Sequence, residues 1–164
     1  MKMNKHVIRF TLNGEPVEAY VDDSISMLDF LRDQMNLTGT KRGCEEGECG
    51  ACSILLDDRV VTSCMMLASE ADGHDIVTIE GVMRNGELHP LQKEFIDKWA
   101  LQCGFCTPGM EMATLALLLE NPAPSEEEIR VALSGNLCRC TGYVKILDAV
   151  RLACRDVSWL DDFR

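Results

Sequence analysis

The first half of the chain alternates between apolar and polar residues in short runs that are typical of β-strands. Asn13-Gly14 separates the first two runs and supplies the left-handed conformations that a tight hairpin turn needs. Asp57-Asp58 separates a second pair in the same way. The expected strands are residues 7–12, 16–21, 53–57, 59–64 and 76–79.

A helix is expected between the two hairpins. Ile25, Leu28 and Met35 fall at helical spacing, and Asp22-Asp23-Ser24 offers N-capping side chains just before them. Two hairpins, one helix and a final strand make a small α+β domain, which we assign to residues 1–82.

The second half has helical spacing throughout, beginning after the Asn85-Gly86 and His89-Pro90 breaks. Residues 110–119 are apolar almost all round, which predicts a central helix. The other expected helices are one with Leu91, Phe95 and Trp99 inward, one capped by Ser125 and running to Leu133, and one at 143–157. We therefore expect a helical bundle domain at residues 83–164.

Charge and hydropathy exclude two classes of partner. The 164 residues contain 16 Lys and Arg against 27 Asp and Glu, and a net charge of −11 repels nucleic acid. The longest apolar run, around 116–119, ends at Glu120 and is too short to span a membrane. Residues 1–9 lack the apolar stretch of a secretory signal, so we expect a cytoplasmic protein.

Cysteine is the residue type that points to chemistry. The chain has nine cysteines, and an odd number fits a disulfide scaffold poorly because one thiol would stay unpaired. Clustered thiols in a reducing compartment indicate metal or redox chemistry. The nine are Cys44, Cys49, Cys52, Cys64, Cys103, Cys106, Cys138, Cys140 and Cys154.

The first quartet has the spacing C-x4-C-x2-C at Cys44, Cys49 and Cys52, and Cys64 follows after eleven residues. This is the plant-type ferredoxin pattern, in which four thiolates hold a 2Fe-2S cluster. Gly43, Gly47 and Gly50 lie where a loop wrapped tightly around a cluster needs positive φ or close backbone approach. Structural zinc is the weaker alternative, because zinc sites usually use two short paired-cysteine knuckles and this quartet contains one at most.

The second quartet combines Cys103-x2-Cys106 with Cys138-x-Cys140, and each pair precedes an expected helix. Thr107 and Thr141 are the expected N-caps, so two helix N-termini would favour an anionic site. Spacing alone leaves an iron–sulfur cluster, structural zinc and a redox-active dithiol open, although no βαβ pattern supports the dithiol.

Three segments together resemble the small iron–sulfur subunits of the xanthine dehydrogenase (molybdenum hydroxylase) family. They are CEEGECGAC at 44–52, QCGFCTPG at 102–109 and GNLCRCTGY at 135–143. The resemblance implies an N-terminal β-grasp (ferredoxin-like) domain and a C-terminal four-helix domain, each with one 2Fe-2S cluster. It assigns Cys44, Cys49, Cys52 and Cys64 to the first cluster, and Cys103, Cys106, Cys138 and Cys140 to the second.

The same resemblance implies a function. The chain would be the non-catalytic electron-transfer subunit of a heteromeric hydroxylase or dehydrogenase, with Gln102 and Cys140 contacting molybdopterin. Electrons would pass from the molybdopterin site through the second and then the first cluster. The implied partners are a large subunit with molybdopterin in its cytosine dinucleotide form and a medium FAD subunit, assembled as a dimer of heterotrimers. A zinc-binding module and a free-standing ferredoxin are the alternative functions.

Several other residues are assigned to packing instead of chemistry. We expect Cys154 to be a buried thiol on the last helix. For Trp99 and Phe105 core packing is the expectation, and contact with a partner is the alternative. His6, His74 and His89 show no spacing typical of metal ligands.

Overall fold

The computed structural model describes residues 5–83 and 86–160. Within these residues, a mixed five-stranded sheet forms the N-terminal half. Met1–Asn4, in the segment that lacks the features of a secretory signal, and Asn85, at the expected domain break, lie outside the described residues. The strand order is β2-β1-β5-β3-β4, with β1 parallel to β5 and the other pairs antiparallel. The strands are β1 (Lys5–Leu12), β2 (Glu15–Asp22), β3 (Ser53–Leu56), β4 (Arg59–Thr62) and β5 (Asp75–Val77).

Both predicted hairpins are confirmed. Leu12 pairs with Glu15 across Asn13 and Gly14, which have φ of 54° and 84°. Leu56 pairs with Arg59 across two left-handed aspartates. The last strand ends earlier than predicted, because the Thr78 amide donates to Asn13 Oδ1 (2.8 Å) and a 3₁₀ turn begins at Ile79.

The helix between the hairpins starts later than predicted. Ser24 is not its cap, because the Ser24 amide and hydroxyl both bond Asp22. Ser26 caps α1 (Met27–Asp29) by accepting from the Asp29 amide (3.1 Å). The chain continues as a π-helical turn at Phe30–Gln34, where the Met35 amide donates to the Phe30 carbonyl.

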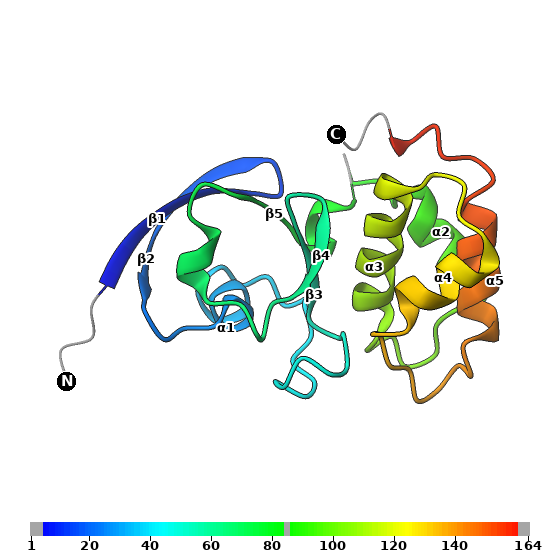
Figure 1. Ribbon diagram of the computed structural model, residues 1–164, viewed down its shortest axis with the longest axis horizontal. Helices are drawn as coiled ribbons and strands as arrows, with labels where there is room; N and C mark the ends of the chain where they lie inside the picture. The colour runs from blue at the N-terminus through cyan, green and yellow to red at the C-terminus, as the bar shows by residue number, and fades with distance from the viewer. Residues whose placement is uncertain (1–4, 84–85, 161–164) are drawn as a thin grey trace.

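Four helices form the described C-terminal half: α2 (Pro90–Asp97), α3 (Thr107–Glu120), α4 (Glu126–Leu133) and α5 (Val144–Ala153). α3 is buried on nearly all sides, as its apolar sequence predicts, and it lies between the sheet and the other helices (Figure 1). α5 is shorter than predicted and ends at Ala153, with Cys154 as its C-cap. No described helix is long and apolar enough to cross a membrane.

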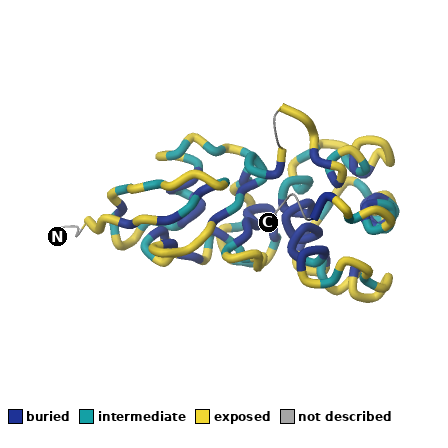
Figure 2. The backbone as a smooth tube through the Cα atoms, turned by 90° about the horizontal axis from the view of Figure 1, so that it is seen from above, coloured by how far each residue is buried: buried dark blue, intermediate teal, exposed yellow. Residues whose placement is uncertain are grey.

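The protein has two hydrophobic cores that share strand β3. Ile54 points into the N-terminal core with Phe30, whereas Leu55 points into the helical core with Phe95, because successive strand residues face opposite sides. Figure 2 shows buried segments inside both halves and exposed segments along the outer loops. The helical half therefore packs on the sheet directly, and the two cysteine-rich regions meet along this contact.

Candidate metal centres

The first cysteine quartet lies on one loop and on the segment after β4. Cys44, Cys49 and Cys52 belong to the loop that leads into β3, and Cys64 follows β4. Cys52 is buried and the other three thiols are half-buried. The Cys49 side chain lies close enough to Cys44 to affect the pKa of that thiol, and the Cys52 side chain likewise affects the pKa of Cys64.

Backbone amides surround these thiols. The Glu46 amide donates to Cys44 Sγ (3.4 Å), and this bond, with others from the same loop, lowers the pKa of Cys44 to about 7. Burial raises the pKa of Cys64 to about 11, although the Gly47 amide opposes this. Amide donors directed at sulfur stabilise a thiolate, which is the form that binds metal.

The loop glycines behave as the spacing predicts. Gly47 and Gly50 have φ of 81° and 66°. Gly43 has an ordinary φ, but a Cβ there would lie 2.7 Å from Cys49 Sγ, so only glycine fits.

The second quartet joins two distant segments. Cys103 Sγ lies 3.6 Å from Cys140 Sγ, and the Cys138 side chain lies close enough to Cys106 to affect the pKa of that thiol. Cys103 and Cys140 are exposed, whereas Cys106 and Cys138 are half-buried. The inner pair lies towards the protein and the outer pair faces solvent.

Both predicted helix starts border this second site, but the predicted caps are wrong. α3 begins at Thr107 after Cys106, because Thr107 already has helical geometry and cannot cap it. α5 begins after Tyr143, a left-handed residue whose amide donates to Thr141 Oγ1 (3.2 Å).

Hydrogen bonds also distinguish the two inner thiols of this site. Burial raises the pKa of Cys106 to about 12. Burial acts in the same direction on Cys138, but the Thr141 hydroxyl (3.1 Å) and amide (3.5 Å) donate to its sulfur and lower its pKa overall. Thr141 therefore stabilises the thiolate form of its neighbour.

The donor set fits a 2Fe-2S cluster better than a zinc ion. Four thiolates around one zinc would gather about a single point. A 2Fe-2S cluster instead has two irons that share four thiolates, so two thiols belong to each iron. Each quartet brings four thiols together, as this arrangement requires.

Other residues singled out in the sequence have separate positions. Gln102 is exposed next to Cys103. The expected core packing of Trp99 and Phe105 is wrong, because these residues are 81% and 48% exposed. Trp99 follows α2 in a left-handed turn (φ 55°). Cys154 is half-buried and packs against the helical core.

The histidines have partners within their own surroundings. His6 pairs with Asp23, His74 Nδ1 lies 2.6 Å from Asp57, and His89 caps α2.

Sequence reasoning missed two residues beside the second quartet. The side-chain Nδ2 of Asn136 donates to the backbone carbonyl of Gly50 in the first cysteine loop (2.9 Å). The Tyr143 hydroxyl accepts from the backbone amide of Cys138 (2.8 Å). Both lie in the GNLCRCTGY segment, where their positions beside ligand candidates were the signal that could have identified them.

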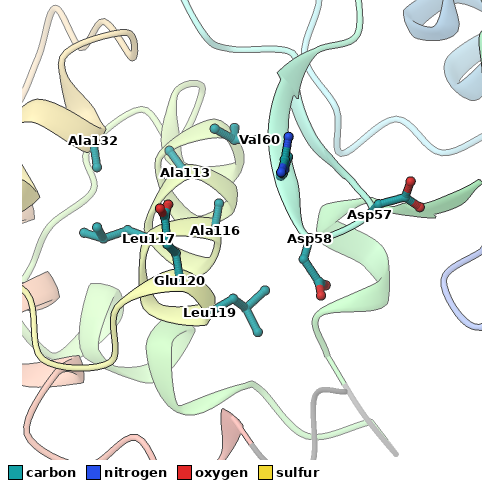
Figure 3. A pocket seen from close by; sticks show the side chains of 10 residues that line it. Asp57, Asp58, Val60, Ala113, Ala116, Leu117, Leu119, Glu120 and Ala132 are labelled. Carbon is teal, nitrogen blue, oxygen red and sulfur yellow. The ribbon is translucent and has the colours of Figure 1, made fainter.

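A groove of about 610 Å³ separates the β3–β4 turn from α3 (Figure 3). Asp57 and Asp58 line one side, and Ala116, Leu119 and Glu120 line the other. No cysteine lines it, so it is separate from both candidate metal centres.

Comparisons with known proteins agree with this geometry. Residues 10–77 match the family model of the 2Fe-2S iron-sulfur cluster binding domain, and residues 78–151 match that of the [2Fe-2S] binding domain. The nicotinate dehydrogenase small FeS subunit of Eubacterium barkeri is 51% identical over 151 residues, covering 92% of this chain and 96% of the relative. A probable xanthine dehydrogenase subunit of Bacillus subtilis is 46% identical, covering 93% and 86%.

A solved structure shows the same fold at similar identity. It is quinoline 2-oxidoreductase from Pseudomonas putida 86, with a TM-score of 0.87 and 47% sequence identity over 92% of this chain and 96% of that one. This chain therefore belongs to the small 2Fe-2S subunits of the xanthine dehydrogenase (molybdenum hydroxylase) family.

Proposed function

We propose that the chain is the electron-transfer subunit of a heteromeric molybdenum hydroxylase and holds one 2Fe-2S cluster in each half. The observation that carries this proposal is that the fold brings the four cysteines of each quartet close to one another, with Cys103 Sγ 3.6 Å from Cys140 Sγ in the second. Cys44, Cys49, Cys52 and Cys64 would hold one cluster, and Cys103, Cys106, Cys138 and Cys140 the other. When bound, such a cluster accepts or releases one electron at a time.

The chain's own residues hold the clusters and adjust their electrostatics. Thiolates supply all eight ligands, and donors such as the Glu46 amide and the Thr141 hydroxyl direct positive dipoles at the sulfurs. Hydrogen bonds to cluster sulfurs favour the more negative, reduced state.

The second quartet is the end that we assign to the molybdopterin subunit. Cys103, Cys140 and Gln102 are exposed there, and Trp99 and Phe105 expose large apolar surfaces nearby in the sequence. Exposed aromatic residues are typical of surfaces that a partner covers. We propose that Gln102 and Cys140 contact molybdopterin, and that electrons continue through the first quartet to a flavin subunit or another acceptor.

The remaining proposals concern the assembly and its cofactors. They are molybdopterin in its cytosine dinucleotide form, FAD in a medium subunit, a dimer of heterotrimers, a cytoplasmic location, and domains at 1–82 and 83–164. Support for a heteromer comes from the relatives, among them the caffeine dehydrogenase subunit gamma of Pseudomonas sp. (strain CBB1), 49% identical over 152 residues.

The test is purification of the chain, with an affinity tag, from its native host. We expect recovery of a complex in which a larger chain contains molybdenum. Recovery of the chain alone, stable and carrying both clusters, would instead favour a free-standing ferredoxin.

A further inference from the structure

Asn136 is a buried polar side chain between the two candidate metal centres. It is 5% exposed, and its Nδ2 donates to the Gly50 carbonyl (2.9 Å) and lies 3.3 Å from Ser53 Oγ. The Gly50 carbonyl already accepts from the Ser53 amide (3.1 Å) and hydroxyl (2.8 Å). Asn136 is therefore not needed to satisfy this carbonyl, and its contribution is to fix one segment against the other.

The neighbouring residue joins the two ligand segments directly. The Leu137 amide donates to the Cys49 carbonyl (2.9 Å). Cys49 belongs to the first quartet, and Leu137 is bonded covalently to Cys138 of the second. This hydrogen bond thus connects a candidate ligand of each centre through backbone atoms.

Close packing holds this junction in one arrangement. A Cβ on Gly109 would lie 2.2 Å from the Gly50 carbonyl oxygen, and a Cβ on Gly50 would lie 2.5 Å from Asn136 Nδ2. The backbone amide of Asn136 donates to the Leu133 carbonyl at the end of α4 (3.0 Å). Three segments therefore meet here with no room for a side chain at Gly50 or Gly109.

We propose that Asn136 is a positioning residue that holds the two cysteine segments together, so that the Leu137–Cys49 hydrogen bond couples the two clusters. This inference rests on the proposed function, since it requires a cluster in each half. Only a short side chain with an N–H donor satisfies the site. Aspartate has nearly the same size but turns an acceptor towards the Gly50 carbonyl, and alanine reaches neither partner.

The experiment compares Asn136→Ala and Asn136→Asp with the wild-type full chain. Asn121→Ala is the matched control, because Asn121 lies at the far end of α3 and bonds Glu128 and Ala123 instead of a cysteine segment. Two readouts are measured. The first is the spin–spin splitting between clusters in electron paramagnetic resonance, on chains reduced by dithionite. The second is the rate of electron equilibration between clusters on oxidised chains, after a radiolytic pulse that supplies less than one electron per chain.

We expect both Asn136 variants to keep full iron content, to show altered splitting and to equilibrate at least about tenfold more slowly. Asn121→Ala should stay within about twofold of the wild type. Wild-type rates and splitting in either fully loaded variant would overturn the inference. Loss of clusters from both variants would also overturn it, since Asn136 would then be needed for assembly. Absence of one cluster from the wild-type chain would contradict the proposed function itself.

Discussion

The N-terminal centre takes three of its four cysteines from one loop, whereas the C-terminal centre joins Cys106 and Cys138, 32 positions apart. The first includes a buried cysteine, Cys52, among its proposed ligands, and the second presents two exposed ones, Cys103 and Cys140. A loop that wraps its own cluster needs only local sequence. A centre assembled from two segments depends on helix packing and leaves one side open to a partner.

The largest expected effect comes from replacing one cysteine of a quartet, which should remove the cluster of that centre and leave the other cluster in place. Cys52→Ser should lose the two irons of the N-terminal cluster, and Cys140→Ser those of the C-terminal cluster, because each iron needs two thiolates. Cys154→Ser is the control at a cysteine outside both quartets and should keep all the iron. Iron analysis of the three chains checks this. Loss of all iron from either variant would show that the centres are interdependent.

The second comparison concerns the two cores. Phe30 and Phe95 are both fully buried, one in each core, and replacing either with alanine should lower the free energy of unfolding by about 3–5 kcal/mol. Val131→Ala, at an exposed position of α4, is the control and should have little effect.

Unfolding by urea separates the contributions of the halves. Both tryptophans lie in the helical half, so their fluorescence reports on that half alone. Phe95→Ala should shift the fluorescence transition. An equal shift with Phe30→Ala would mean that the halves unfold as one unit, because of the shared strand β3.

The helical half also contains a buried carboxyl, Glu111 on α3. Burial raises its pKa to about 7 from an ordinary 4.5, although Gln92 Nε2 (3.4 Å) offers it a hydrogen bond. The folded state therefore holds this proton more tightly than the unfolded state. The free energy of unfolding should fall as pH rises from about 4.5 to 7, by roughly 3 kcal/mol in total.

Glu111→Gln should remove this pH dependence and raise stability at pH 8 by up to that amount, because the amide keeps the shape and carries no charge. Urea unfolding at pH 5, 6.5 and 8 checks it. Glu120→Gln, at an exposed residue of the same helix, is the control and should leave the slope unchanged. A pH dependence in Glu111→Gln equal to that of the wild type would contradict the assignment.

The smallest expected effect on stability comes from changing an exposed aromatic residue near the second quartet, Trp99, or one on β2, Tyr20. Trp99→Ser should change the free energy of unfolding by no more than about 0.5 kcal/mol, because Trp99 is 81% exposed. It should nevertheless weaken copurification with the molybdenum-containing subunit. Tyr20→Ser, at a 66% exposed residue on β2, is the control and should assemble normally. Equal assembly of both variants would remove Trp99 from the partner surface.

Local signals predicted much of this structure. Asn13-Gly14 determined the first hairpin, and the spacing of Cys44, Cys49 and Cys52 indicated the first centre without further help. The π-helical turn after α1 was missed, because Leu28 and Leu31 fit a regular helix equally well. The second centre depended on family resemblance, since two short cysteine pairs are also compatible with zinc. The Asn136–Gly50 contact joins residues 86 positions apart, which no periodicity reveals.

Iron, acid-labile sulfide and zinc content of the purified full chain tests the central claim most directly. Two 2Fe-2S clusters predict about four irons and four sulfides per chain, with no stoichiometric zinc. Two irons together with one zinc would contradict the account, because the C-terminal cysteines would then form a structural zinc site.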